Sequence, residues 1–271
     1  MTLAHTLVTH DGAQPSRWML LLHGLLGRGS NLLGLARRLA ADDPDTGVVL
    51  PDLRMHGDSQ HCAPPHTLAR AAGDVRELVA ALPVTVPALA GHSFGGKVAL
   101  RLLDDPWPAL ESVFVLDASP SSRRDRPAND ITLRVIAALG AAPPRFESRQ
   151  RFMEALERAG IDLGLRQWLA KNLVRDGAQY RFAIDLDAIA ELLADYDRND
   201  LWPIASAPPP SIRLAFAIGG RSASLSAAEQ SRLRALARRG VIALHELPKA
   251  GHWVHVDDPD GVLRVLQTAF D

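Results

Sequence analysis

Short apolar runs alternate with amphipathic stretches along residues 1–120. The apolar runs are continuous, as is typical of strands buried on both faces of a sheet, and they occupy residues 17–24, 47–54, 86–91 and 112–120. The stretches between them carry leucine and alanine at helical spacing, and they occupy residues 31–40, 67–82 and 94–105. This alternation predicts an α/β fold, with a mostly parallel sheet flanked by helices.

The alternation is interrupted between residues 121 and 205. A polar stretch opens this region, and helical patterns with no clear strand between them follow near residues 130–140, 147–159, 162–175 and 185–195. The earlier pattern then resumes, with strands at 211–220 and 241–247 and helices at 226–240 and 259–270. We therefore expect a core domain built from residues 1–120 and 206–271, with a helical cap inserted at residues 121–205.

The composition limits the partners that the protein can bind. A net charge of -1 in 271 residues provides no basic surface for nucleic acid. The single cysteine, Cys62, excludes an intrachain disulfide, and the histidines near it are too loosely spaced for us to expect a metal site. Without a membrane-spanning apolar run or a secretion signal, we expect a cytoplasmic protein. The oligomeric state stays open.

The segment GHSFG places Ser93 between a predicted strand and a predicted helix. Such a sharp bend strains the backbone of its middle residue, and the residues two positions before and after it must be small. Gly91 and Gly95 meet that need. The bend would lift the serine hydroxyl to the carboxyl end of the sheet, where α/β folds bind ligands. This is the pattern of a nucleophile elbow; a plain turn with a serine N-cap is the alternative.

A nucleophilic serine needs a base, and the C-terminal region offers three histidines. His252 follows Ala250 and Gly251 in a compact loop after the last predicted strand, so we assign it as the base. His245 falls inside that strand, and we expect His255 to be structural.

An oxyanion hole requires main-chain donors near the nucleophile. His23 and Gly24 end an early predicted strand, where the backbone can approach closely and the amide of Leu25 can face the site. The amide of Phe94, at the start of the helix after Ser93, would be the second donor. The His23 side chain is expected to bridge loops rather than to react.

The acid that orients the base is harder to assign. The loop after Gly220 contains no aspartate, and its first carboxylate, Glu229, falls inside a predicted helix. Asp117 ends the strand predicted to lie beside the Ser93 strand, so its carboxylate can reach the far nitrogen of His252. A role as a turn former is the alternative for Asp117. Three further carboxylates are poorer candidates because they fall in the predicted insertion: Asp195, Asp197 and Asp200.

Five segments, HGLLG, DLRMHGDS, GHSFGGKVAL, LDASP and AGHWVHVDDP, occur in this order. Together they resemble the α/β-hydrolase superfamily, and within it the small acyl esterases of the YbfF type. The resemblance implies a Ser93–His252 dyad with Leu25 and Phe94 as main-chain donors, an acid after the sixth strand, which supports Asp117, and a helical cap over the site. The chain departs from the superfamily at GGRSASL, where an aspartate is common.

The resemblance also implies a function. We expect hydrolysis of short- to medium-chain acyl esters through an acyl-enzyme on Ser93, with thioesters also compatible and no cofactor required. Arg54 and His56 are expected in a loop network near the site. Hydrolysis of C–C bonds or lactones on the same scaffold is an alternative, as is a ligand-binding homologue that has lost catalysis.

The predicted insertion is rich in aromatic side chains. They would either line an acyl pocket or pack the insertion onto the core. These side chains are Phe146, Phe152, Trp168, Tyr180, Phe182 and Trp202.

Overall fold

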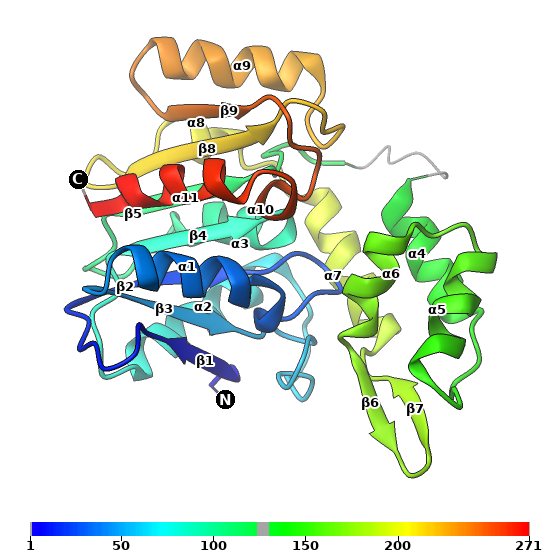
Figure 1. Cartoon of the computed structure of the whole chain (residues 1–271). Coiled ribbons are helices and arrows are strands. Elements are labelled where there is room, and N and C mark those ends of the chain that lie inside the picture. The colour runs from blue at the N-terminus through cyan, green and yellow to red at the C-terminus, as the bar shows by residue number, and fades with distance from the viewer. Residues whose placement is uncertain (1, 124–129, 271) are drawn as a thin grey trace.

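A computed structural model describes residues 2–123 and 130–270 (Figure 1). Its main feature is a seven-stranded sheet with the strand order β1-β3-β2-β4-β5-β8-β9. β1 runs antiparallel to β3, and every other neighbouring pair is parallel. The strands are β1 His5–Val8, β2 Arg17–Leu22, β3 Thr46–Pro51, β4 Ala88–His92, β5 Ser112–Leu116, β8 Arg213–Gly219 and β9 Ala243–Leu247. The predicted parallel α/β sheet is confirmed, whereas the sequence pattern missed β1.

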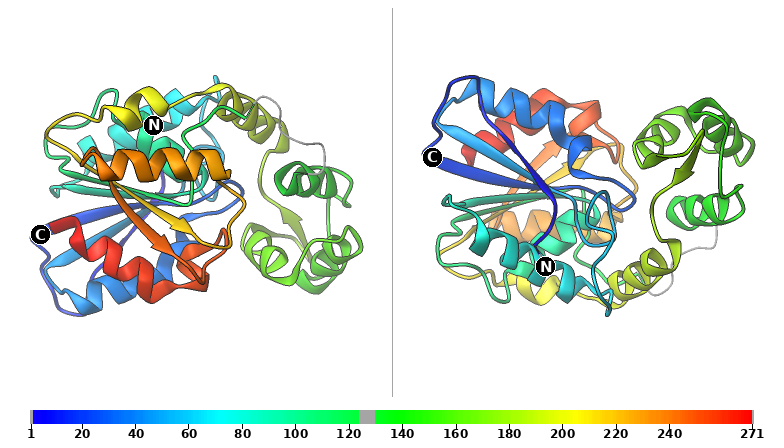
Figure 2. Two further views of the ribbon diagram at one scale, coloured as in Figure 1. Left: turned by 90° about the horizontal axis from the view of Figure 1, so that it is seen from above. Right: turned by 90° about the horizontal axis from the view of Figure 1, so that it is seen from below.

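Helices cover both faces of the sheet (Figure 1, Figure 2). One face packs against α1 Leu33–Asp42 and α11 Pro259–Gln267, and the other against α2 Leu68–Ala81, α3 Phe94–Leu102 and α9 Ala227–Arg238. Along β2, Met19 and Leu21 pack in the hydrophobic cluster on the side of α1 and α11. Leu20 and Leu22 pack in the cluster on the other side, with α2, α3 and α9. Since successive side chains point to opposite faces, a strand covered on both sides needs an unbroken apolar run.

The insertion lies beyond the carboxyl ends of the central strands (Figure 1, Figure 2). Its helices are α4 Ile131–Gly140, α5 Arg149–Arg158, α6 Leu163–Ala170 and α7 Leu186–Arg198. The polar stretch that opens it falls partly on residues 124–129, outside the described residues. Among residues 2–123 and 130–270, no helix is both long and apolar enough to cross a membrane.

The expectation that no strand interrupts the helices of the insertion is wrong. The predicted helix over 162–175 ends at Ala170, and an antiparallel hairpin follows, formed by β6 Leu173–Asp176 and β7 Gln179–Phe182. Gly177 turns the chain with a φ of 63°. Strands of four residues with partly exposed side chains carry little periodic signal, and the Asp176-Gly177 pair was the available turn signal.

The insertion is fastened to the core at both of its ends. Lys97, on α3, is completely buried, and its Nζ donates to the carbonyl oxygens of Ser121, at 2.7 Å, and Tyr196, at 2.8 Å. The ammonium also lies 4.2 Å from the centre of the Tyr196 ring. These contacts give Lys97 a structural role, because it joins α3 to both ends of the insertion. The short helix α8 Trp202–Ser206 begins inside the predicted insertion but packs against α3 of the core.

Gly91→Ala tests the close approach of β4 to α3. A Cβ atom at Gly91 would overlap the carbonyl oxygen of Gly95, which is backbone and cannot swing aside. We expect a loss of about 3 kcal/mol in unfolding free energy, measured by urea titration. Gly73→Ala is the matched control, because Gly73 lies in α2 with open space around it, and this change is expected to add up to about 1 kcal/mol. Equal stability of the Gly91→Ala and native proteins would contradict the tight elbow.

Candidate active site

Ser93 occupies a strained bend between β4 and α3. Its φ of 54° and ψ of -114° lie outside the regions that an L-residue adopts freely. The bend is held on both sides, because the Ser93 amide donates to Leu116 O at 3.0 Å and Lys97 N donates to Ser93 O at 3.1 Å. Two close approaches require glycine, since a Cβ at Gly91 would meet Gly95 and a Cβ at Gly95 would meet the carbonyl oxygen of Leu22. The backbone therefore has the shape expected of a nucleophile elbow.

The structure brings Ser93, His252 and Asp117 together. His252 Nε2 lies 3.1 Å from Ser93 Oγ, and His252 Nδ1 lies 2.7 Å from Asp117 Oδ2. Asp117 and Ser93 therefore lie at the two opposite nitrogens of this imidazole. Asp117 is completely buried. An ionised carboxylate only accepts hydrogen bonds, so it holds the proton on Nδ1 and leaves Nε2 free to accept the serine proton.

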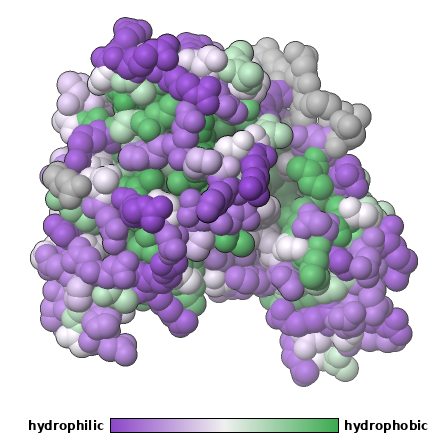
Figure 3. Space-filling model, turned by 45° about the horizontal axis from the view of Figure 1, so that its top comes forward, coloured by the Kyte–Doolittle hydropathy of each residue, from purple (hydrophilic) through white to green (hydrophobic). Residues whose placement is uncertain are grey.

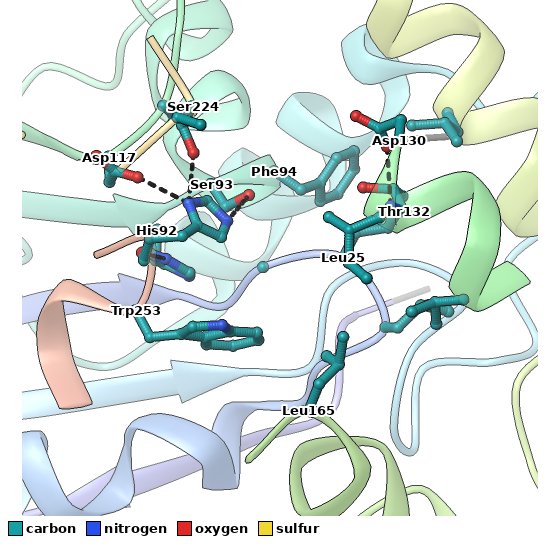
Figure 4. A pocket seen from close by; sticks show the side chains of 18 of the residues that line it. Leu25, His92, Ser93, Phe94, Asp117, Asp130, Thr132, Leu165, Ser224 and Trp253 are labelled. Carbon is teal, nitrogen blue, oxygen red and sulfur yellow. Dashed lines mark hydrogen bonds and ion pairs between the residues drawn. The ribbon is translucent and has the colours of Figure 1, made fainter. Parts of the chain in front are cut away.

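Two serines in the loop after β8 contact the carboxylate of Asp117 and the imidazole of His252. Ser222 Oγ donates to Asp117 Oδ2 at 2.6 Å, and the Gly219 amide donates to Oδ1 at 2.9 Å. Ser224 Oγ lies 2.7 Å from His252 Nδ1 (Figure 4). Sequence reasoning missed both serines. They stand in GGRSASL, the segment that lacks the aspartate common in the superfamily. Ser222 binds the acid, and Ser224 contacts the base.

The other histidines and carboxylates weighed from the sequence lie elsewhere. Glu229 accepts from the Ser226 amide and the Ser119 hydroxyl, so it caps α9. His245 is part of β9, and His255 is buried against the rings of His92 and Trp168. In the insertion, Asp195 accepts from the Leu68 amide at the start of α2, and Asp200 accepts from the Trp202 amide.

The loop that carries Leu25 is held by two buried histidines. His23 Nε2 accepts from the Leu53 amide at 2.9 Å, and His56 Nε2 accepts from the Leu26 amide at 3.0 Å. Each Nδ1 faces a carbonyl oxygen at 2.8 Å, which fixes the tautomer because a carbonyl can only accept. Burial lowers the pKa of His23 to about 4 and that of His56 to about 3, so both rings are neutral.

Arg54 belongs to the same loop network. It is almost completely buried, and its Nε donates to Asp74 Oδ2 at 2.6 Å. Gly24 lies between this network and the nucleophile: a Cβ there would approach His92 Nδ1 to 3.2 Å and Ser93 Cβ to 3.4 Å. The amides of Leu25 and Phe94 donate to no other residue within the described ranges. Both residues border the same cavity as Ser93.

A cavity of about 420 Å³ opens above Ser93, a volume typical of small-molecule sites. The core contributes Leu25, Phe94 and Trp253 to its wall. The insertion contributes both apolar and polar side chains: Ile131, Val135, Leu165, Leu169, Leu193 and Tyr196, together with Arg123, Asp130, Thr132 and Asp162. Figure 3 shows hydrophobic side chains of the insertion beside the groove that separates it from the core.

The idea that the six aromatic residues of the insertion line this cavity is wrong. None of them is among its lining residues in the described part of the chain. Phe152 is fully buried between the rings of Phe146 and Phe182, at 5.2 and 5.7 Å between centroids, so these three form the insertion's own core. Trp168 packs on Trp253 at 4.3 Å. The alternative reading, in which such aromatics serve packing, therefore describes them.

No candidate metal centre accompanies these groups. Within residues 2–123 and 130–270, no group of three or more His, Cys, Asp or Glu side chains is arranged to hold a metal ion. Cys62 is partly buried, and its thiol donates to Ser59 O at 3.3 Å.

Comparison with known proteins defines the class. A sequence model of the Alpha/beta hydrolase family matches residues 19–265, and the chain belongs to this family. It is 31% identical over 266 residues to an sn-1-specific diacylglycerol lipase of Mus musculus, covering 96% of this chain and 82% of the relative. It is 29% identical over 251 residues to the esterase YbfF of Escherichia coli (strain K12), covering 92% and 91%. The predicted resemblance to YbfF-type hydrolases is confirmed.

A solved structure supports the same fold. A marine microorganism esterase aligns with 99% of this chain and 99% of its own at a TM-score of 0.82, with 24% sequence identity.

His56→Gln tests the buried histidine network through its pH dependence. The pKa of His56 is about 3 in the folded protein against 6.5 ordinarily, so at intermediate pH the unfolded chain binds the additional proton. Stability from the neutral ring is thus complete above the ordinary pKa and is lost as the pH falls below it, at up to about 1.4 kcal/mol per pH unit. The glutamine side chain can accept the hydrogen bond from the Leu26 amide, and it has no group that titrates in this pH range. Between about pH 7 and pH 5, we expect the variant to lose about 2 kcal/mol less unfolding free energy than the native protein in urea titrations.

The comparison carries its own control. Above about pH 7 the His56 ring is neutral in both the folded and the unfolded native chain, and glutamine carries no charge at any pH. The stability curves of the two proteins should therefore run parallel there. Curves that stay parallel down to about pH 5 would contradict a neutral, buried His56.

Proposed function

We propose that the protein is a serine ester hydrolase that forms an acyl-enzyme on Ser93. The observation that carries the proposal is the continuous contact from the buried Asp117 carboxylate through His252 to the Ser93 hydroxyl, with 2.7 and 3.1 Å between the interacting atoms. A strained serine, an imidazole of fixed tautomer and a carboxylate are the groups that acyl transfer needs. The named relatives, a lipase and an esterase, support esters as the substrate class.

In the acylation step, His252 Nε2 takes the Ser93 proton as Oγ attacks the ester carbonyl carbon. The carbonyl electron pair moves onto oxygen, where the amides of Leu25 and Phe94 donate to the developing charge. Each such donor is typically worth about 10²–10³ in rate. The intermediate then collapses and expels the alcohol, which takes the proton from His252. The buried Asp117 carboxylate stabilises the imidazolium that exists between these proton transfers.

Deacylation repeats the sequence with water as the nucleophile. His252 Nε2 removes a proton from water, which attacks the acyl carbon. Collapse of the second intermediate breaks the bond to Ser93 Oγ, which takes back its proton, and the carboxylic acid leaves. Each turnover consumes one ester and one water, and no redox change or metal is involved.

The size of the cavity supports acyl groups of short to medium length. Its volume of about 420 Å³ must hold both the acyl and the alcohol parts. Aliphatic side chains of the insertion would contact the acyl chain, and charged and polar side chains share that wall. The insertion would act as a cap that encloses the acyl chain and keeps it from water. Thioesters present the same carbonyl to Ser93 and are accommodated by the same mechanism.

Ser93→Ala tests the nucleophile. Because alanine cannot form the acyl bond, we expect hydrolysis of p-nitrophenyl acetate and butyrate to fall by about 10³-fold or more, while the circular dichroism spectrum is retained. Ser16→Ala is the control, since Ser16 is exposed and its hydroxyl contacts only Asp45 among the described residues. Activity of Ser93→Ala close to that of the control would overturn the proposal.

Asp117→Asn tests the acid. The amide keeps the shape but can present N–H to His252, which favours the wrong tautomer, so kcat should fall by about 10⁴-fold. Glu229→Gln is the control: it changes a partly buried carboxylate that caps the start of α9 and does not contact His252 among the described residues. A larger loss in Glu229→Gln than in Asp117→Asn would mean that the acid has been misassigned.

A further inference from the structure

The residue after the proposed oxyanion donor has an unusual backbone. Leu26 has a φ of 59°, although it is a leucine and its side chain is buried. A residue with a Cβ adopts this left-handed conformation only when its surroundings impose it. The orientation of the Leu25 amide depends on how the neighbouring peptide units are held. The contacts that hold Leu26 therefore also orient the Leu25 amide.

Two buried side chains from distant parts of the chain hold Leu26. Its amide donates to His56 of the core at 3.0 Å, and its carbonyl oxygen accepts from Asn172 Nδ2 at 2.7 Å. Asn172 belongs to the insertion, between α6 and β6, and only 2% of it is exposed. A carbonyl can only accept, so the amide nitrogen of Asn172 must face it. Within the described residues, Asn172 Oδ1 has no hydrogen-bond partner, which leaves Leu26 as the side chain's one polar contact.

The same part of the insertion also touches the loop of the base. Trp168 leaves no room for a side chain at Gly27, since a Cβ there would collide with the indole ring. The Trp168 ring also lies 4.3 Å from the ring of Trp253, the residue after His252. Residues 168–172 of the insertion therefore contact both the loop of the proposed oxyanion donor and the loop of the proposed base.

We propose that Asn172 is a positioning residue for the oxyanion hole, and that the insertion completes this hole when it is docked on the core. This inference rests on the proposed function, because the Leu25 amide needs an oxyanion to stabilise. His56 binds the amide of Leu26, and Asn172 binds its carbonyl oxygen. When the Asn172 bond is lost, Leu26 can relax toward an ordinary backbone conformation and turn the Leu25 amide away from the substrate oxygen.

The inference predicts a particular kinetic signature. The oxyanion forms in the tetrahedral intermediate and the transition states around it, and not in the bound ester, so a misaligned donor lowers kcat and leaves KM nearly unchanged. A trifluoromethyl ketone adds to a nucleophilic serine as a charged hemiketal and therefore also needs the oxyanion hole. The methyl ketone of the same chain length fills the cavity without that charge. A role in packing alone would weaken both inhibitors together.

The test compares Asn172→Ala and Asn172→Leu with Asn199→Ala in the full-length protein. Leucine branches at Cγ as asparagine does but has no donor, and because it is larger it leaves no cavity of the kind that could unfold the alanine variant. Asn199 lies in the same insertion and makes a similar side-chain bond to Asp195 O at 2.7 Å, away from the oxyanion loop. For both Asn172 variants we expect kcat to fall about 10- to 100-fold, KM to change less than about threefold, and trifluoromethyl ketone affinity to fall as much as kcat.

The outcomes separate this inference from the proposed function. If the native protein hydrolyses esters but the folded Asn172 variants match Asn199→Ala, then Asn172 does not position the donor and only this inference fails. Equal weakening of both ketones in the Asn172 variants would also overturn it. If the native protein itself hydrolyses no ester, the proposed function has failed.

Discussion

The fully buried carboxylate of Asp117 is the constraint on which the geometry at the carboxyl edge of the sheet depends. A buried charge is tolerable only when it is surrounded by donors, and here these are the Gly219 amide, the Ser222 hydroxyl and His252 Nδ1. The hydrogen bonds to this carboxylate therefore fix the positions of both the loop after β8 and the His252 imidazole. The opposite nitrogen of that ring then faces Ser93, whose strained bend leaves its hydroxyl in one position.

The insertion contributes more than a wall to the cavity. Lys97 binds the carbonyl oxygens of Ser121 and Tyr196, which fastens the insertion to the same helix that begins after Ser93. Asn172 then binds the loop of the proposed oxyanion donor. On the role that we propose for Asn172, the insertion would link enclosure of the substrate to stabilisation of the transition state.

Local patterns explain what the sequence could predict. The strands, the helices and the elbow at Ser93 each follow from residues that are close together in the chain, and Asp117 followed from the order of neighbouring strands. The hairpin β6–β7 escaped because its strands are four residues long. Ser224 and Asn172 escaped because their partners lie 28 and 146 residues away, and nothing in their own neighbourhood marks them. The aromatic residues of the insertion were visible, but their periodicity cannot tell packing from substrate contact.

The most direct test is to ask which serine is the nucleophile, because Ser93, Ser222 and Ser224 all lie within hydrogen-bonding distance of the Asp117–His252 pair. The protein is treated with a fluorophosphonate, digested, and the modified residue is located by tandem mass spectrometry. We expect one adduct per chain, on Ser93, and no adduct once His252 is replaced by alanine. An adduct on Ser222 or Ser224, or the absence of any adduct on the native protein, would contradict it.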